Sequence, residues 1–232
     1  MATGDATAGG TESFRERHRG IIEAIRQAVY ILGKNRLTIA GILMVVLVVL
    51  TGLAAPLIAP HPEDVGSVTH LDPRLEGPSA DHPFGTDALG RDIFSRVLFG
   101  AQISIRIAVL VVGSALAIGI PLGLTAGYVG GRTEMLIMRV TDVFVSVPRL
   151  ILPVAVAGAL GPSLRNVMLA LIVTWWPWYV RLLRSEVKEV KQAEYVQAVE
   201  GLGASKIRIM FRHLLPNSIT SLLVQATMDM GW

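Results

Sequence analysis

The chain has 232 residues, 52% of them hydrophobic, and a mean hydropathy of +0.54. This hydropathy is well above that of an ordinary soluble domain, so the sequence predicts a membrane protein. The absence of cysteine excludes disulfides, thiolate metal sites and a cysteine nucleophile, and a net charge of only +3, with cations grouped beside apolar segments, argues for membrane topology over nucleic-acid binding.

The first 36 residues are expected to form a cytoplasmic tail and a basic amphipathic segment. Residues 1–13 are small and polar without periodicity, which indicates a disordered tail. In residues 14–36, Ile21, Ile25 and Val29 share one helical face among many basic residues. This pattern indicates a helix along the cytoplasmic membrane surface or, alternatively, a solvated helix leading into the first span.

Residues 37–58 are expected to form the first transmembrane helix. They carry no charge and would be about 33 Å long as a helix, enough to cross a hydrocarbon core of about 30 Å. Residues 59–104 are polar and poor in cations, which predicts an extracytoplasmic loop. The irregular spacing of His61, His70 and His82 in this loop favours surface residues over a metal site.

The second span is expected at residues 105–128, before a glycine-rich turn at residues 127–134. A third span starts near Met135 and contains Arg139, Asp142 and Pro148. Ionisable groups at membrane depth need a cavity, a partner or the interface, and a proline there frees backbone groups that need similar shelter. These three residues are candidates for a translocation pathway. The alternative places Arg139 and Asp142 in the cytoplasmic headgroup layer as i, i+3 neighbours.

The fourth span is expected at residues 166–180, with an aromatic cluster at its inner end beside Arg181: Trp175, Trp176, Trp178 and Tyr179. The cluster is typical of an aromatic belt at the membrane interface, and the alternative is a cage of aromatic rings that stacks on the substrate. Residues 218–232 begin a fifth span but are too few to complete it. An unfinished span would leave terminal carbonyls and the Asp229 carboxylate at membrane depth, where each is costly if unsatisfied, so we expect a chain truncated from a longer protein.

Two short amphipathic helices around Gly203 are expected between the last two spans, in a cation-rich cytoplasmic loop at residues 181–216. Apolar residues recur at helical spacing on both sides of that glycine: Tyr195, Ala198, Val199 and Leu202, then Ile207, Met210, Phe211 and Leu214. Gly203 suits a left-handed turn, and Pro216 is expected to stop the second helix. Because such short helices cannot bury their own stripes, the pair either packs on the rest of the chain or docks on a partner.

This loop resembles the EAA loop of permease subunits of binding-protein-dependent ABC importers. The resemblance rests on the order Gln197-Ala198-Val199, three residues, Gly203, and a Leu-Leu-Pro sequence that ends at Pro216. Gln197 stands in place of the usual glutamate, and His213 in place of an isoleucine. Residues 82–104 and the turn at residues 127–134 resemble the dipeptide, oligopeptide and nickel branch. The resemblance implies an ATPase-coupling loop formed by Tyr195, Gln197, Ala198, Leu202, Gly203, Ile207, Met210, Phe211, Leu214, Leu215 and Pro216.

The expected fold is therefore all-α, a polytopic membrane helical bundle of four full transmembrane helices and an incomplete fifth, with a cytoplasmic coupling helix pair. Residues 105–232 would form the permease core. The sequence contains no catalytic constellation, and the P-loop-like glycines Gly85 and Gly90 are followed by Arg91 and Asp92 where lysine and Ser/Thr belong. We therefore expect no enzymatic activity, no cofactor and no metal in this chain, with ATP used by partner subunits.

The resemblance also implies partners: cytoplasmic ATPase subunits, a second homologous permease subunit, an extracytoplasmic solute-binding protein and membrane lipid, but no nucleic acid. It implies a multi-pass location in the cytoplasmic membrane with the N-terminus inside. The function expected is import of peptides or a nickel complex. The alternative is a membrane scaffold or a secondary transporter whose cytoplasmic helix pair recruits a partner, although the inverted repeats and buried ion site of a secondary transporter are not visible in the sequence.

Overall fold

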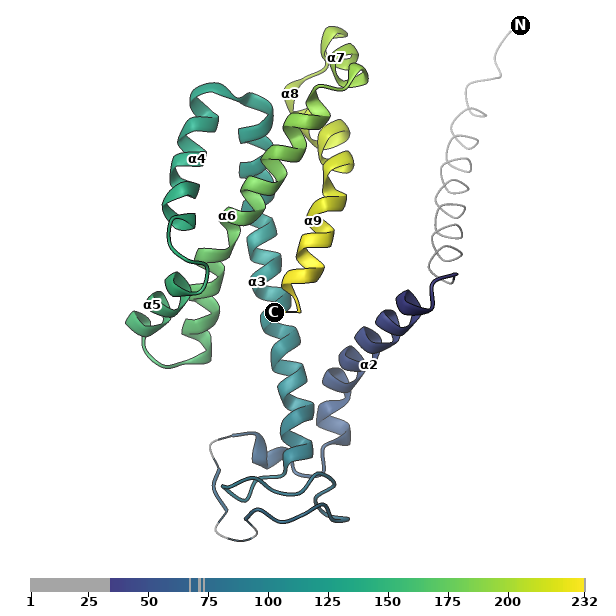
Figure 1. Cartoon of the computed structure of the whole chain (residues 1–232), viewed down its shortest axis with the longest axis vertical. Helices are drawn as coiled ribbons and strands as arrows, with labels where there is room; N and C mark the ends of the chain where they lie inside the picture. The colour runs from purple at the N-terminus through teal and green to yellow at the C-terminus, as the bar shows by residue number, and fades with distance from the viewer. Residues whose placement is uncertain (1–33, 67, 71, 73, 232) are drawn as a thin grey trace, which may run out of the picture. The chain divides into compact units, whose positions relative to one another are not determined.

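The computed structural model describes residues 34–66, 68–70, 72 and 74–231, and the expectations for residues 1–33 lie outside this range. The described chain is helical, which confirms the all-α expectation (Figure 1). In chain order the helices are α2 (Arg36–Ile58), η1 (Pro62–Val65), α3 (Ile93–Val129), α4 (Gly131–Val145), α5 (Ile151–Leu160), α6 (Leu164–Lys191), α7 (Glu194–Gly201), α8 (Lys206–Ile209), η2 (Met210–Leu214) and α9 (Leu215–Asp229). They divide into two units between Gln102 and Ile103, within α3.

Three of the described helices, α2, α3 and α6, are long and apolar enough to cross a membrane. They contain the first, second and fourth expected spans. The helix of the second span begins at Ile93, earlier than expected, because Asp92 caps it: the Asp92 carboxylate accepts a hydrogen bond from the Ser95 backbone N–H at 2.7 Å. Residues 93–104, expected in the loop, are therefore helical.

The third span is not one continuous helix, and this corrects the expectation of four full transmembrane helices. Helix α4 ends at Val145 and α5 begins at Ile151. Pro148 lies in the break, where it lacks an N–H and disfavours helical backbone at Val147 before it. Both halves pack on α6 (Figure 1).

In the second unit, α3 and α6 approach closely along a stripe of glycines spaced four residues apart. Their counterparts on α6 have the same spacing. A Cβ atom added at Gly119, Gly123 or Gly127 would lie 2.6, 2.8 or 2.7 Å from the Cβ of Tyr179, Leu183 or Val187, respectively. Real Cβ atoms do not approach that closely, so the helix contact depends on the missing side chains.

In the first unit, the loop after α2 folds around two buried carboxylates, Asp64 and Asp92. Asp64 accepts a hydrogen bond from the Asp92 backbone N–H at 2.8 Å and lies 2.7 Å from His70 Nε2. His82 Nδ1 lies 3.2 Å from the Asp92 carboxylate. Burial disfavours the charged form of Asp92, but hydrogen bonds from Ser95 and His82 outweigh it and lower the pKa of this carboxyl.

These contacts correct the expectation that the loop histidines are plain surface residues. His70 and His82 each pair with a buried aspartate, and the rings of His61 and His82 have centroids 4.7 Å apart. Among the described residues, no group of three or more histidine, aspartate or glutamate side chains is arranged to hold a metal ion. The histidines serve to order the loop.

Candidate functional site

The expected helix pair consists of α7 and α8, joined at Gly203. Gly203 has a φ of +80°, as the left-handed turn requires. Leu202 and Ile207, on either side of the turn, are 88% and 68% exposed, and Tyr195 and Phe211 are about half exposed. The other exposed residues of the expected coupling set are Gln197, Ala198, Gly203 and Pro216. The turn thus presents an apolar surface to its surroundings.

The remainder of the expected stripes is covered by the rest of the chain, which is the first of the two alternatives left open by the sequence. Leu214 is fully buried, and Val199, Met210 and Leu215 are partly buried against the core of the second unit. Two residues outside the expected set, Val196 and Ile209, are also fully buried there. The helices are apolar on two faces, and one face packs on the ends of α6 and α9.

Pro216 does not stop a helix, contrary to the expectation. It lies in the first turn of α9, where a missing N–H is tolerated, and the π-helix η2 leads into this turn. The Leu215 N–H donates to the Met210 carbonyl, and the Asn217 side-chain amide donates to the His213 carbonyl at 2.6 Å. The segment from Lys206 to Asp229 is therefore continuously helical.

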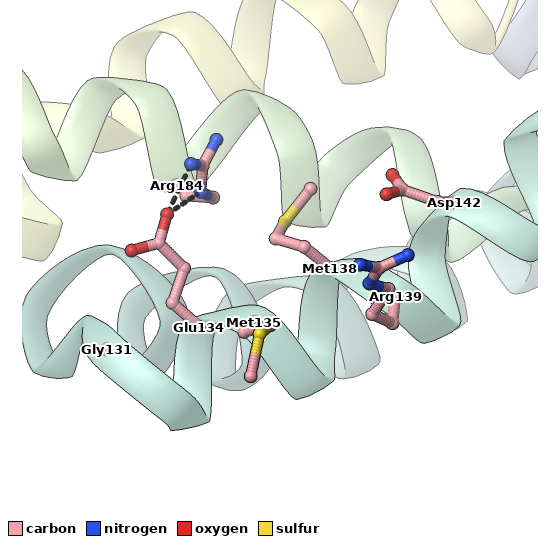
Figure 2. Close-up of a pocket in the computed structure, with 7 residues that line it drawn as sticks. All are labelled: Gly131, Glu134, Met135, Met138, Arg139, Asp142 and Arg184. Carbon is pink, nitrogen blue, oxygen red and sulfur yellow. Dashed lines mark hydrogen bonds and ion pairs between the residues drawn. The ribbon is translucent and has the colours of Figure 1, made fainter.

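Charged residues also link α4 to α6. Figure 2 shows Glu134 of α4 and Arg184 of α6 pointing toward one another, and Arg184 Nε donates to the Glu134 carboxylate at 2.6 Å. Asp142 pairs with Arg181 at 2.6 Å. Two candidate pathway residues, Arg139 and Asp142, line a pocket of about 260 Å³, and Glu134 and Arg184 line the same pocket. The third, Pro148, lies outside that pocket, in the break between α4 and α5.

A larger cavity, of about 580 Å³, lies between α3, the break after Pro148, α6 and the end of α9. Its walls are mostly apolar. Arg149 and Asp229 are the charged residues in its described lining, and they form an ion pair at 2.8 Å. A mostly apolar cavity of this size with few polar groups is typical of a small-molecule site.

Asp229 is held by four hydrogen bonds, and only 1% of its side chain is exposed. One carboxylate oxygen accepts from Arg149 Nη2 at 2.8 Å and from Gln225 Nε2 at 3.0 Å. The other accepts from Trp175 Nε1 at 3.1 Å and from the Tyr179 hydroxyl at 2.9 Å. The Asp229 carboxylate is therefore satisfied, because the chain itself supplies the donors.

The aromatic cluster of α6 is mostly internal, which corrects its interpretation as an interfacial belt. Trp175, Trp176 and Tyr179 are buried, whereas Trp178 is 38% exposed. The Trp176 ring packs on Phe144 with centroids 5.3 Å apart. The Trp175 N–H and the Tyr179 hydroxyl donate to the buried Asp229 carboxylate, and Trp175 lines the cavity.

Sequence reasoning did not select Arg149 and Asp229 as site residues. Arg149 follows Pro148 within the expected third span and Asp229 lies in the expected fifth, but nothing in their spacing joins them, since they lie 80 residues apart. The available signal was that each is an ionisable residue within an apolar stretch, which by default marks a functional site.

Long apolar helices, one span interrupted between α4 and α5, and a cavity holding an ion pair are the features of a multi-pass membrane protein of the transport class. Residues 119–232 match the family described as the binding-protein-dependent transport system inner membrane component. Residues 24–78 match the N-terminal transmembrane domain of oligopeptide transport permease C.

Individual relatives agree with these matches. The dipeptide transport system permease protein of Alkalihalophilus pseudofirmus is 39% identical over 206 residues, covering 89% of this chain and 67% of the relative. The probable D,D-dipeptide transport system permease protein of Escherichia coli is 44% identical over 203 residues, covering 88% and 67%. The oligopeptide transport system permease protein of Bacillus subtilis is 34% identical over 223 residues, covering 96% and 71%.

The chain belongs to the inner membrane permease components of binding-protein-dependent ABC importers, and the family resemblance of its EAA-like loop is confirmed. It is a transmembrane permease subunit, from a family that works with ATPase and binding-protein partners.

Proposed function

We propose that this permease subunit imports peptides through the cytoplasmic membrane. The cavity between α3, α6 and α9 carries the proposal, because its volume of about 580 Å³ and its single ion pair in apolar walls suit a small peptide. The relatives named as dipeptide, D,D-dipeptide and oligopeptide permeases support the same substrate class. ATP is used by partner ATPase subunits, while this chain performs no catalysis and needs no cofactor.

Uptake into proteoliposomes tests the substrate class. The vesicles contain the assembled transporter, which we propose comprises this chain, a second homologous permease subunit and the ATPase subunits, in lipid and with the extracytoplasmic binding protein added. We expect ATP-dependent uptake of labelled alanine peptides of two and five residues. A nickel complex is the other substrate that the resemblance implies. Uptake of labelled nickel without any peptide uptake would contradict the proposal.

The exposed apolar turn between α7 and α8 is proposed to dock on an ATPase subunit. Leu202 and Ile207 project there, beside the cations Lys206 and Arg208. An apolar patch rimmed by polar residues is typical of a protein interface. Motion of the ATPase would then reach the membrane through α6 and α9, on which the buried face of the helix pair packs.

Two glycine variants test this docking surface. A Cβ at Gly203 or at Gly201 meets nothing within 4 Å, but only Gly203 has a positive φ. Gly203→Ala should strain the turn and reduce co-purification of the ATPase, whereas Gly201→Ala should leave it unchanged. Wild-type co-purification with Gly203→Ala would refute the docking role.

The proposed topology places the N-terminus and residues 181–216 inside and the loop after α2 outside. Because the chain has no native cysteine, single cysteines report sidedness cleanly. In intact cells, an impermeant maleimide should label Asp81→Cys from outside but not Ser205→Cys. Labelling of Ser205→Cys from outside would overturn this topology.

A further inference from the structure

We propose that Arg149 binds the terminal carboxylate of a peptide in the cavity, and that Asp229 is the positioning residue that holds Arg149 for this task. This inference rests on the proposed peptide-import function. It assigns different roles to the two members of the ion pair, and the roles follow from their hydrogen-bonding capacity.

Asp229 has little capacity left for a substrate. Its two carboxylate oxygens already accept four hydrogen bonds, from Arg149, Gln225, Trp175 and Tyr179. A carboxylate offers about four lone-pair positions. A peptide ammonium group would have to displace one of these donors, so Asp229 does not serve as the binding group.

Arg149 has the capacity that Asp229 lacks. A guanidinium has five N–H donors, and among the described residues only Asp229 accepts a hydrogen bond from this one, through Nη2. The Arg149 side chain is 36% exposed and lines the cavity. Its guanidinium carbon lies 4.1 Å from the centroid of the Trp175 ring. Stacking and ion pairing fix the plane of the guanidinium, and the remaining donors form a fork that matches a carboxylate.

The backbone around Arg149 favours the same ligand. Arg149 lies in the break between α4 and α5, and α5 begins two residues later without a side-chain cap. The Ile151 N–H donates to the Pro148 carbonyl, and Pro153 has no N–H. Among the described residues, Leu152 therefore carries the one N–H left open in this first turn. The partial positive charge of a helix N-terminus adds to the charge of Arg149. Irregular backbone at membrane depth occurs where it lines a cavity, and interrupted helices form the substrate sites of several transporter folds.

The cavity walls contribute little side-chain specificity. Ile107, Val111 and Leu171 are apolar and make no directional contacts. The substrates in the names of the relatives differ in length and stereochemistry, but peptides share a terminal carboxylate. A site that binds the terminal carboxylate and makes no specific contact with the peptide side chains would accept all of these peptides.

Chemical protection tests the site in the assembled wild-type transporter. Phenylglyoxal modifies accessible arginines, and mass spectrometry follows modification at each position. N-acetylalanine, which carries only a carboxylate charge, should slow modification of Arg149 several-fold, whereas uncharged N-acetylalaninamide should not. Arg165, exposed in the first turn of α6, should be unaffected by either compound. Equal slowing by both compounds, no slowing, or no reaction of Arg149 at all would overturn the proposal.

Substitutions give a second readout. Arg149→Gln should lower peptide uptake about tenfold or more, because it removes a charge-assisted hydrogen bond, and Arg149→Lys should retain part of the activity. Arg165→Gln is the matched control. Wild-type uptake by an assembled Arg149→Gln transporter would contradict the inference. If Arg149→Gln fails to assemble, the protection experiment decides. If the wild-type transporter imports no peptide but N-acetylalanine still protects Arg149, the proposed function fails and the carboxylate site stands.

Discussion

The glycine stripe of α3 predicts an unusual response to the smallest possible substitution. In Gly123→Ala, the new Cβ would lie 2.8 Å from the Leu183 Cβ and 3.1 Å from the Val180 carbonyl oxygen of α6. Neither atom is the end of a flexible side chain, so α3 and α6 must separate. Overpacking of this kind costs about 1–3 kcal/mol. Gly113 of the same helix is the matched control, because a Cβ there meets nothing within 4 Å.

Gly113→Ala should instead stabilise α3 by about 0.5–1 kcal/mol, since alanine has the higher helix propensity. Gly123→Ala gains the same propensity, so the two variants should differ by the overpacking cost alone, about 1–3 kcal/mol. Thermal unfolding in detergent, followed by the fluorescence of the buried tryptophans of α6, measures the difference. The midpoint of Gly123→Ala should fall by several degrees, on the order of 2–4 °C per kcal/mol for a chain of this size. If Gly123→Ala proves as stable as Gly113→Ala, the argument from close helix contact is wrong.

Two further outcomes follow from charged groups. Glu134→Gln removes the negative charge that pairs with two basic side chains of α6 and should lower stability by about 1–2 kcal/mol. Thermal unfolding measures the effect against Glu189→Gln, which changes an exposed carboxylate of α6. Burial opposes ionisation of Asp87, but hydrogen bonds from the Arg91 side chain and from two backbone N–H groups lower the pKa of this carboxyl to about 2. The stabilisation from the ionised Asp87 is present above the unfolded-state pKa and is lost as the pH falls from about 4 to 2. Hydrogen-exchange protection of the loop should therefore drop in that window, and an unchanged protection factor would contradict the role of Asp87.

Local sequence signals predicted most of the long helices. Residues 37–58 and the apolar core of α3 are uninterrupted stretches long enough to span a membrane. Gly203 predicted the turn between α7 and α8, because glycine is favoured where the backbone has a positive φ. Pro148 indicated a break in the third span, because a proline within a helix lacks the N–H that the helix needs. The effect of Pro216 was misjudged because a proline in the first turn of a helix looks the same in sequence as one that follows a helix.

The cavity could not be predicted in the same way. The pair of Arg149 and Asp229 depends on a contact between segments far apart in the chain, and periodicity carries no information about such contacts. The buried face of the helix pair was missed for a related reason. Val196 and Ile209 lie beside the stripes of Leu202 and Ile207, and only the packing of α7 and α8 on α6 and α9 decides which face is covered.

The continuity of η2 and α9 joins the pair of α7 and α8 to the ion pair at the cavity through one helical segment. Helix α9 has 15 residues and is therefore about 22 Å long, with the helix pair at one end and Asp229 at the other. If it pivots rigidly at Pro216, a tilt of about 10° moves the far end by about 4 Å. That displacement exceeds the 2.8 Å separation between the Arg149 and Asp229 polar atoms. A tilt directed away from Arg149 would therefore lengthen this contact beyond hydrogen-bonding distance.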